Sequence, residues 1–237
     1  MPGNRKRVYL QHKKYNMNVI ERIIGFLAPH ACLGCGTEGG LLCYQCMALL
    51  PAMPSRCFIC TAPSAAFRTC AACEAAGLPE QVWVTTTYAG AAKQLIHALK
   101  FNRAGDAADT IAAAIVAALP ADQQWIVTHA PTVYARARQR GYDQAQRIAR
   151  QVARRSGNPY ASLLTRQGVQ RQLGQSRVVR QQQMVGVFRA PAPSAVADHD
   201  ILLIDDVLTT GSTLSVAAQV LYAAGARHVA AAVFAAA

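Results

Sequence analysis

The stretch Ile201-Leu-Leu-Ile-Asp-Asp-Val-Leu-Thr-Thr-Gly-Ser-Thr-Leu214 decides the fold, because it joins an apolar run, two acids and a hydroxyl-rich loop. Four consecutive apolar residues at 201–204 are typical of a central parallel strand that is buried on both faces. Asp205 and Asp206 follow at the carboxyl end of this strand, where open α/β sheets bind their ligands. The stretch therefore predicts an α/β protein with a ligand site at this strand end.

A helix is predicted directly after the loop, because apolar residues recur at helical spacing from Leu214 to Leu221 and Gly225 ends the pattern. The loop then lies at a helix N-terminus, where unpaired N–H groups and the helix dipole attract phosphate. Gly211 allows close backbone approach, and the hydroxyl groups add donors. Spacing alone leaves one alternative open, an ordinary strand-to-helix turn with solvated acids. The chain contains no Gly-x-x-x-x-Gly-Lys-Ser/Thr motif, which disfavours a P-loop NTPase.

This stretch resembles the phosphoribosyl pyrophosphate (PRPP) loop of the type I phosphoribosyltransferases. In that family, two acids hold the ribose hydroxyls, and a Thr-Thr-Gly-x-Thr segment holds the 5′-phosphate. The resemblance implies that Asp205 and Asp206 are the catalytic, ribose-binding acids and that Mg²⁺ binds together with PRPP. It also implies that the phosphate is held by Thr209, Thr210, Gly211, Ser212 and Thr213.

All eight cysteines lie within 42 residues and form four C-x2-C pairs. The pairs are Cys32/Cys35, Cys43/Cys46, Cys57/Cys60 and Cys70/Cys73. Each pair can present two thiolates to one ion, so the four pairs predict two structural zinc sites with four sulfur ligands each. Pairing in sequence order is expected because it closes short loops, and a crossed arrangement stays open. Disulfides are the alternative, which the lack of a signal peptide disfavours.

The net charge of +12 is concentrated in two segments. Residues 1–16 carry five bases and no acid, and residues 131–190 carry 12 Arg with Asp143 as the single acid. After Lys100 every Lys or Arg position is Arg, the side chain that best forms paired contacts with phosphate. This distribution predicts a polyanionic partner, either a phosphorylated small molecule or nucleic acid. The codon usage of a GC-rich genome is the alternative source of the arginine bias.

The composition, 52% hydrophobic and 15% charged, is typical of a globular protein. No apolar run approaches the roughly 20 residues that span a bilayer. Residues 19–28 superficially imitate a signal peptide, but Glu21 and Arg22 interrupt the apolar region. We therefore expect a cytoplasmic chain. Residues 1–16 are expected to be a basic tail, and residues 17–28 a short amphipathic helix that packs on the next module rather than on a membrane.

The remaining pattern predicts more strands and helices of an α/β domain after a linker at 74–81. Strands are expected at 82–88, 125–130, 160–164 and 227–234, and helices at 92–101, 106–119 and up to about residue 155. Three arginines at alternate positions, Arg136, Arg138 and Arg140, follow the strand at 125–130 and suggest a diphosphate clamp. A solvated basic face is the alternative. The polar segment 166–183 is typical of a lid or binding loop.

The order of these features resembles the ComF family of competence-associated phosphoribosyltransferase-like proteins, over roughly residues 28–235. The matching pieces are the cysteine pairs, Tyr88 with Leu-Ile-His-Ala-Leu-Lys-Phe101, Arg-Gly-Tyr-Asp-Gln144, the segment from Gln172 through Arg180 to Gly-Val-Phe188, and the PRPP loop. Tyr142, Asp143 and Gln183 depart from the family, which usually has Phe, Asn and Asn there.

The predicted fold is therefore a type I phosphoribosyltransferase-like parallel sheet flanked by helices at 82–237, preceded by a small double zinc ribbon at 29–76. The resemblance implies that the chain binds Mg-PRPP and assists the uptake of single-stranded DNA in natural transformation, with the DNA-uptake machinery as a partner. Arginines proposed to contact nucleic acid are Arg171, Arg177 and Arg180. An active phosphoribosyltransferase with an unknown acceptor and no DNA role is the alternative. A third possibility is that the cysteine module only stabilises or docks the domain.

Overall fold

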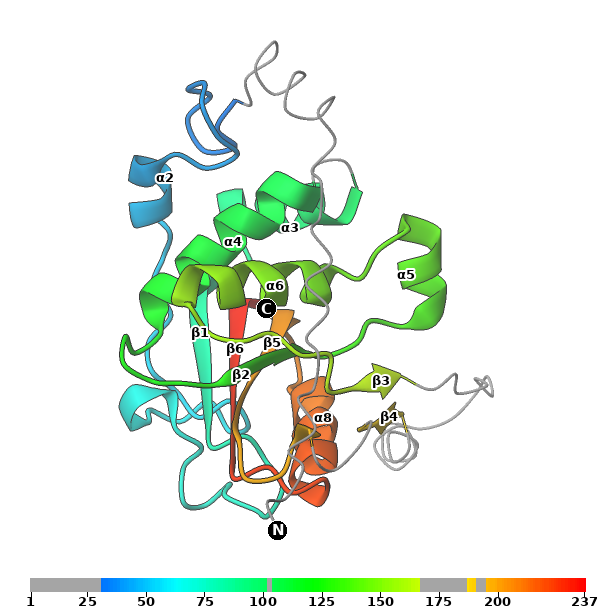
Figure 1. Ribbon diagram of the computed structural model, residues 1–237. Helices are drawn as coiled ribbons and strands as arrows, with labels where there is room; N and C mark the ends of the chain where they lie inside the picture. Colours follow the sequence, from blue (N-terminus) through cyan, green and yellow to red (C-terminus); the bar gives the residue numbers. More distant parts are fainter. Residues whose placement is uncertain (1–30, 102–103, 167–186, 191–194) are drawn as a thin grey trace, which may run out of the picture.

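The computed structural model describes residues 31–101, 104–166, 187–190 and 195–237 (Figure 1). Its centre is a four-stranded sheet in the order β1-β6-β5-β2, in which all neighbouring strands are parallel. These strands are β1 (Gln81–Thr87), β2 (Ile126–His129), β5 (Asp200–Leu208) and β6 (His228–Ala236). The basic tail, the expected helix at 17–28, the first two residues of the predicted ribbon module and residues 167–183 of the predicted lid lie outside the described residues.

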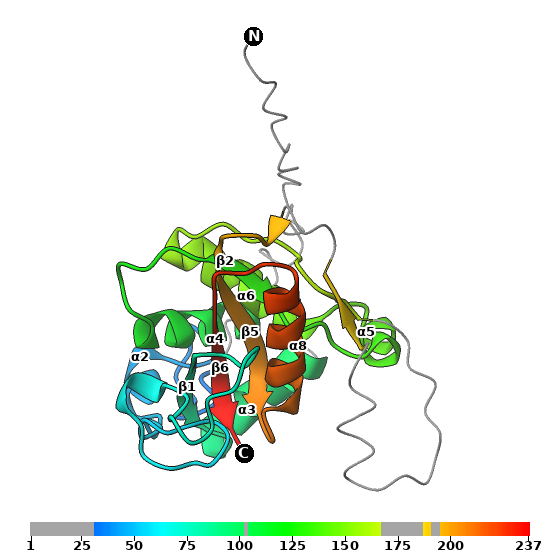
Figure 2. The ribbon, with the colours of Figure 1, turned by 90° about the horizontal axis from the view of Figure 1, so that it is seen from below.

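Helices cover both faces of this sheet (Figures 1 and 2). On one face lie α3 (Gly90–Phe101), α4 (Ala104–Ala118) and α6 (Gln144–Ser156), and α8 (Ser212–Ala223) lies on the other. Shorter elements are α2 (Tyr44–Ala48), η1 (Ala65–Phe67), α5 (Tyr134–Arg140) and the antiparallel pair β3 (Thr165–Arg166) and β4 (Phe188–Arg189). The predicted α/β class is confirmed. Within the described ranges, every helix is too short or too polar to cross a membrane.

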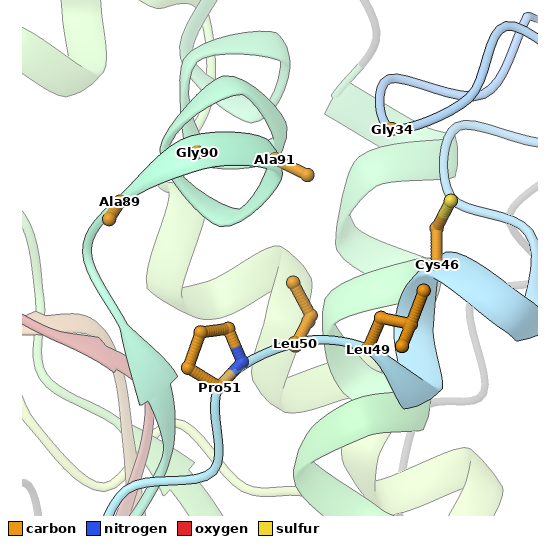
Figure 3. A pocket seen from close by; sticks show the side chains of 8 residues that line it. All are labelled: Gly34, Cys46, Leu49, Leu50, Pro51, Ala89, Gly90 and Ala91. Atoms are coloured by element: carbon orange, nitrogen blue, oxygen red, sulfur yellow. The ribbon is translucent and has the colours of Figure 1, made fainter.

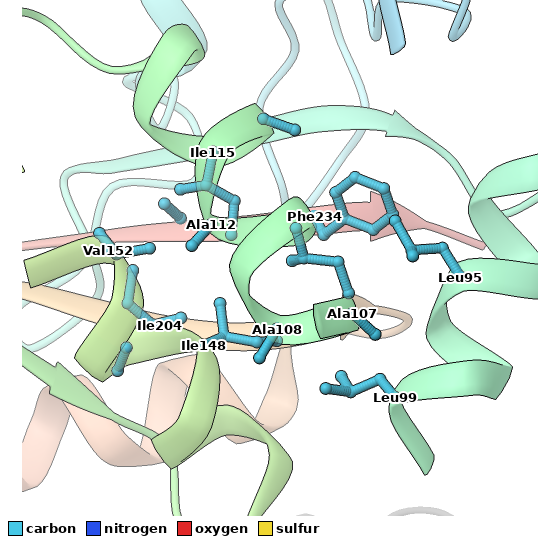
Figure 4. Close-up of a cluster of buried hydrophobic side chains, with 14 of the residues drawn as sticks. Leu95, Leu99, Ala107, Ala108, Ala112, Ile115, Ile148, Val152, Ile204 and Phe234 are labelled. Carbon is cyan, nitrogen blue, oxygen red and sulfur yellow. The ribbon is translucent and has the colours of Figure 1, made fainter. Parts of the chain in front are cut away.

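Strand β5 is buried on both faces, as its four apolar residues predict. Leu202 and Ile204 belong to the hydrophobic cluster under α3, α4 and α6, which also contains Phe234 of β6 (Figure 4). Ile201 and Leu203 belong to the opposite cluster, together with side chains of α8. Each fully buried side chain of this kind contributes roughly 1.5–3 kcal/mol through burial. This central strand therefore anchors the two layers of helices to one sheet.

Strand β5 continues past its apolar run to Leu208, because β6 keeps pairing with it as far as Leu208 and Ala236. On its other side β2 ends at His129, which is opposite Ile204. Asp205 and Asp206 therefore lie in the last four residues of β5, beyond the end of β2. Their backbone is held by β6 on one side only.

One prediction about local structure was wrong. The strand expected at 160–164 forms only an isolated bridge between Tyr160 and Val127, because the amide of Leu163 donates to the side-chain Oγ1 of Thr128 at 3.1 Å instead of to a backbone carbonyl. The long helix expected up to about residue 155 is confirmed as α6, and the arginine-containing segment before it forms the separate short helix α5. Gly141, with a φ of 77°, ends α5.

The cysteine-rich segment packs along the outer edge of β1. Ala52 forms an antiparallel bridge with Thr86, whose hydroxyl donates to the carbonyl of Pro51 at 2.9 Å. Arg68 forms a second antiparallel bridge with Gln81, at the start of β1. The segment is thus attached to the sheet at both ends of this strand.

Candidate functional site

The loop after β5 forms a small polar cavity at the carboxyl end of the sheet. The cavity has a volume of about 20 Å³, enough for a water-sized group. It is lined by Asp205, Val207, Leu208, Thr209, Gly211, Ser212, Thr213 and Leu214. Thr210 lies beside this lining, with its Oγ1 2.9 Å from the Oγ of Ser212. The structure thus brings one predicted acid and the predicted phosphate-binding residues to one place.

Gly211 makes the sharp turn from this loop into α8. It is the N-cap of the helix with a φ of 73°, in the left-handed region that favours glycine. Its carbonyl accepts hydrogen bonds from the amide and the hydroxyl of Ser215, at 2.9 and 3.1 Å. The first amides of a helix have no carbonyl partner within it, which makes the start of α8 suited to an anion. In the free protein the amide of Ser212 donates to the Oγ1 of Thr210 at 3.4 Å.

The two acids have different surroundings. Asp205 is half-buried, and its Oδ1 accepts a hydrogen bond of 2.8 Å from the amide of Asp206. Burial raises the pKa of Asp205 well above its usual value, and the neighbouring charge of Asp206 adds to the effect. Asp206 instead forms an ion pair with Lys100, whose Nζ lies 3.4 Å from its Oδ2. In the free protein, the surroundings of Asp205 therefore favour its neutral form more than water would, while Asp206 has a cationic partner.

Lys100 is a site residue that the sequence analysis did not identify, since it was noted only as part of a resemblance. It lies in the last turn of α3, far from Asp206 in the sequence. Its side chain is 26% exposed and that of Asp206 is 19% exposed, so both remain accessible to a ligand. No local pattern in the sequence connects the two residues, because their contact depends on how α3 packs against the sheet.

The segment after β2 lies next to the acids, because the amide of Ala130 donates to the carbonyl of Ile204 at 3.0 Å. The three arginines of the predicted diphosphate clamp, Arg136, Arg138 and Arg140, all belong to α5. Arg138 is exposed and Arg140 is half-buried. Residues two apart on a helix lie on different sides of it, so the clamp stays a prediction. Arg171, Arg177 and Arg180 lie outside the described residues.

Asp143 organises this segment. One of its carboxylate oxygens accepts from the amide of Thr132 at 2.7 Å, and the other accepts from the hydroxyl of Thr132 at 3.1 Å and from the amide of Gln146 at 3.2 Å. It therefore caps α6 and ties the helix to the chain that leaves β2. Tyr142 adds a second tie, because its hydroxyl donates to the carbonyl of Leu99 at 2.7 Å, next to Lys100.

The eight cysteines form two groups with the same geometry. The first cysteine cluster consists of Cys32, Cys35, Cys43 and Cys46, and the second of Cys57, Cys60, Cys70 and Cys73. Within each cluster the four sulfur atoms lie within 4.8 Å of one another, and all eight cysteines are free thiols. Pairs that are consecutive in the sequence therefore come together, as expected. Four thiolates at this spacing suit a tetrahedral zinc ion, so the clusters could hold two zinc ions.

The surroundings shift the pKa values of the thiols within each cluster in opposite directions. Burial opposes ionisation of Cys32 and Cys57, but backbone N–H donors outweigh it and lower the pKa of each to about 6. The pKa of Cys46 and of Cys73 rises to about 12, mainly because each shares hydrogen bonds with thiols of its own cluster. Protein groups alone thus stabilise some thiolates and disfavour others. A bound dication supplies the charge that four thiolates need.

A larger apolar pocket, of about 270 Å³, lies between the first cysteine cluster and the start of α3 (Figure 3). It is lined by Gly34, Cys46, Leu49, Leu50, Pro51, Ala89, Gly90 and Ala91. This lining has no charged group, so the pocket is unsuited to a phosphosugar. The small cavity after β5 remains the better candidate.

Comparison with protein families agrees with this choice. The family model described as the phosphoribosyl transferase domain matches residues 111–237, which is more than half of the chain. The matched region begins within α4 and contains β2, β5, β6 and the complete loop from Thr209 to Thr213. A search of the curated proteins found no match to the chain.

Proposed function

We propose that this chain, which belongs to the phosphoribosyl transferase domain family, binds PRPP together with Mg²⁺ at the end of β5. The proposal rests on the cavity that is lined by Asp205 and by the loop between β5 and α8. The cavity joins a carboxylate suited to ribose hydroxyls with a helix N-terminus suited to a phosphate. We refer to residues 209–213 as the phosphate loop.

Each group in the site has a role in this proposal. The phosphate loop holds the 5′-phosphate, and Asp205 and Asp206 hold the ribose hydroxyls. Carboxylates together with substrate phosphates are the usual ligands of Mg²⁺, and the ion would neutralise charge on the diphosphate. Lys100 balances Asp206 in the free protein and becomes available to the diphosphate when the ribose occupies the acid. Because the pKa of Asp205 is raised, binding at this carboxylate is accompanied by release of a proton.

Calorimetric titration with Mg-PRPP tests the proposal. We expect saturable binding to the wild type, loss of binding in Asp205→Asn/Asp206→Asn, and unchanged binding in Asp200→Asn, which alters an acid at the other end of β5. Repeating the titration in buffers of different ionisation enthalpy measures the released proton. Failure of the wild type to bind at millimolar PRPP would show that the loop has been misread.

The chain is also proposed to be ComF-like and to assist the uptake of single-stranded DNA in natural transformation. The observation that favours a nucleic-acid partner is the segment 131–190, with 12 Arg and a single acid that is used as a helix cap. Counterion release requires that such binding weaken steeply with salt. Fluorescence anisotropy with a labelled oligonucleotide should therefore show a steep negative slope of log affinity against log salt concentration.

A set of matched variants shows which arginines are responsible for the salt dependence of DNA binding. Neutralising Arg171, Arg177 and Arg180 to Gln is expected to reduce it. Neutralising Arg154 and Arg155, which already pair with Asp109 at 2.8 and 2.6 Å, is expected to change it less. A slope near zero in the wild type would exclude a nucleic-acid partner.

An active transferase without a DNA role is then the remaining proposal. Release of pyrophosphate from PRPP in the presence of candidate acceptors measures this transferase activity.

A further inference from the structure

The second cysteine cluster contacts the phosphate loop through one side chain. Phe58 follows Cys57 in the Cys57/Cys60 pair and is only 9% exposed. A Cβ atom placed on Gly211 would lie 2.8 Å from Cδ2 and 3.0 Å from Cε2 of the Phe58 ring. The ring therefore occupies the space beside the glycine that forms the N-cap of α8. Gly211 has both a positive φ and a neighbour that leaves no room for a side chain.

Phe58 also packs with the residues that flank the loop. Leu208, at the end of β5, and Leu214, in the first turn of α8, belong to the same buried cluster as Phe58. The loop thus turns around the aromatic ring, and its polar side faces the cavity. In a close-packed interior, moving such a ring changes the positions of the atoms that rest on it.

The position of Phe58 is itself determined by the cysteine pair. Cys57 is fully buried, its amide donates to the carbonyl of Ala62 at 2.9 Å, and its carbonyl accepts from the amide of Thr61 at 2.9 Å. The second half of the cluster is fastened to the sheet, since the amide of Thr69 donates to the carbonyl of Glu80 at 2.8 Å. A metal that joins the two cysteine pairs therefore joins Phe58 to the sheet that carries the loop.

The first cysteine cluster has no equivalent contact among the described residues. Its one buried member, Cys32, and the neighbouring Leu41 and Leu42 belong to the hydrophobic cluster under α3 and α4, on the opposite face from α8. Leu33 follows Cys32 as Phe58 follows Cys57, but it packs against that other cluster. The two cysteine clusters are both built from two C-x2-C pairs, but they pack against different parts of the domain.

We propose that the second cysteine cluster holds the phosphate loop in its binding conformation through Phe58, so that PRPP affinity depends on the metal in this cluster and not on the metal in the first. The proposal rests on PRPP binding at the end of β5. Phe58 acts here as a positioning residue, because it contacts the backbone of the loop and does not line the cavity.

The first test compares variants in which one side chain is shortened and all eight cysteines are kept. In Phe58→Ala we expect two bound zinc ions, by elemental analysis, and a Kd for Mg-PRPP about tenfold higher, because a loop in its binding conformation one tenth of the time binds tenfold more weakly. Phe58→Leu, which keeps an apolar side chain, should recover part of the loss. Leu33→Ala is the matched control and should leave the Kd within about twofold of the wild type.

The second test removes one metal ligand from each cluster. Cys60 and Cys35 are exposed and hold the same place in their clusters. Cys60→Ser and Cys35→Ser should each lower zinc binding, but only Cys60→Ser should weaken PRPP binding. Equal Kd values for these two variants would overturn the proposal, as would an unchanged Kd in Phe58→Ala.

Hydrogen exchange without ligand separates this inference from the proposed function. In Phe58→Ala and Cys60→Ser we expect faster exchange at the amides of 211–215, including that of Ser215, which donates to Gly211. In Leu33→Ala and Cys35→Ser these amides should exchange as in the wild type. If the wild type does not bind PRPP, the proposed function fails, and this pattern still decides whether the second cluster holds the loop. Unchanged exchange in both second-cluster variants would refute the inference.

Discussion

Asp205 combines a position that suits a ligand with surroundings that disfavour its own charge. It lies half-buried at the end of β5, beside a second acid, and its pKa is raised for both reasons. A group whose pKa is higher in the folded than in the unfolded state stabilises the fold only when it is protonated. The stability of the chain should therefore fall as the pH rises from about 4, the unfolded value of Asp, through the raised pKa of Asp205.

Replacing this acid with its neutral isostere should stabilise the protein. In Asp205→Asn we expect the free energy of unfolding at pH 7 to rise on the order of 1 kcal/mol. That increase is equivalent to roughly 2–4 °C in Tm for a chain of this size. The pH-dependent loss of stability should become smaller in the variant, and PRPP binding should disappear. Thermal melts between pH 4 and 8 measure the first effect, and calorimetry measures the second.

Asp200, at the start of the same strand, is the control with the opposite sign. Hydrogen bonds from Arg227, at 2.7 and 2.8 Å, lower the pKa of Asp200. Asp200 therefore stabilises the fold at pH values above its pKa in the unfolded chain. This stabilisation is lost as the pH falls through the lower pKa of Asp200 in the folded state. Asp200→Asn should therefore lower the free energy of unfolding by less than about 1 kcal/mol, and Tm only slightly, because the pair is solvent-exposed. If Asp205→Asn and Asp200→Asn both melt at a lower temperature than the wild type, the charge of Asp205 does not destabilise the folded protein.

Lys100 provides a second test at single residues. In Lys100→Gln we expect PRPP affinity to fall about tenfold, since one charge-assisted contact is removed, and stability to change by less than about 1 kcal/mol. Lys93→Gln neutralises an exposed lysine on the same helix and should bind PRPP like the wild type. Equal affinities of Lys100→Gln and the wild type would place Lys100 outside the site.

At the scale of elements, the junction between β2 and α6 depends on Asp143. Asp143→Ala removes three hydrogen bonds and should lower the free energy of unfolding by about 1–2 kcal/mol, the usual effect of losing an N-cap. Asp143→Asn should retain part of this stability, because the amide oxygen still accepts. Asp109→Asn removes exposed ion pairs between α4 and α6 and should have a smaller effect. Urea denaturation of the three variants gives the order of their free energies of unfolding.

The elements predicted correctly from the sequence are those whose pattern reflects one dominant force. Ile201 to Ile204 had to be buried on both faces, and the residues from Leu214 to Leu221 repeat at helical spacing, so β5 and α8 follow from hydrophobic pattern alone. The cysteine clusters follow from ligand spacing in the same way. These local signals were sufficient for the sheet, the loop and the metal-binding groups.

The features that the sequence did not reveal depend on contacts between distant segments. The segment 160–164 has strand-like residues, yet the hydroxyl of Thr128 takes the hydrogen bond that a strand would have made. The contact of Lys100 with Asp206, and that of Phe58 with Gly211, join elements that only the packed structure brings together. Asp143 stood out in the sequence only as a departure from the family pattern, whereas in the structure its carboxylate caps α6.

At the scale of the whole molecule, the cysteine clusters should determine stability. Cys32 of the first cysteine cluster belongs to the core under α3 and α4, and Phe58, next to Cys57 of the second cluster, belongs to the core under α8. We expect two zinc ions per chain in the reduced protein, and a strong chelator should lower Tm on the order of 10 °C, because metal binding to such sites contributes to folding. Elemental analysis and thermal melts check both statements. Absence of zinc from the purified, reduced protein would contradict the assignment.

The attachment of the cysteine-rich segment to β1 has a consequence for association between molecules. Strand β1 stands at one end of the sheet, and the bridges of Ala52 with Thr86 and of Arg68 with Gln81 occupy its outer edge. An uncovered edge strand offers free N–H and C=O groups to any other chain and promotes aggregation. The segment therefore covers this edge of the sheet, and zinc ions bound to the two cysteine clusters would hold it in place. Chelation should make the protein self-associate through β1, with a concentration dependence that light scattering would detect.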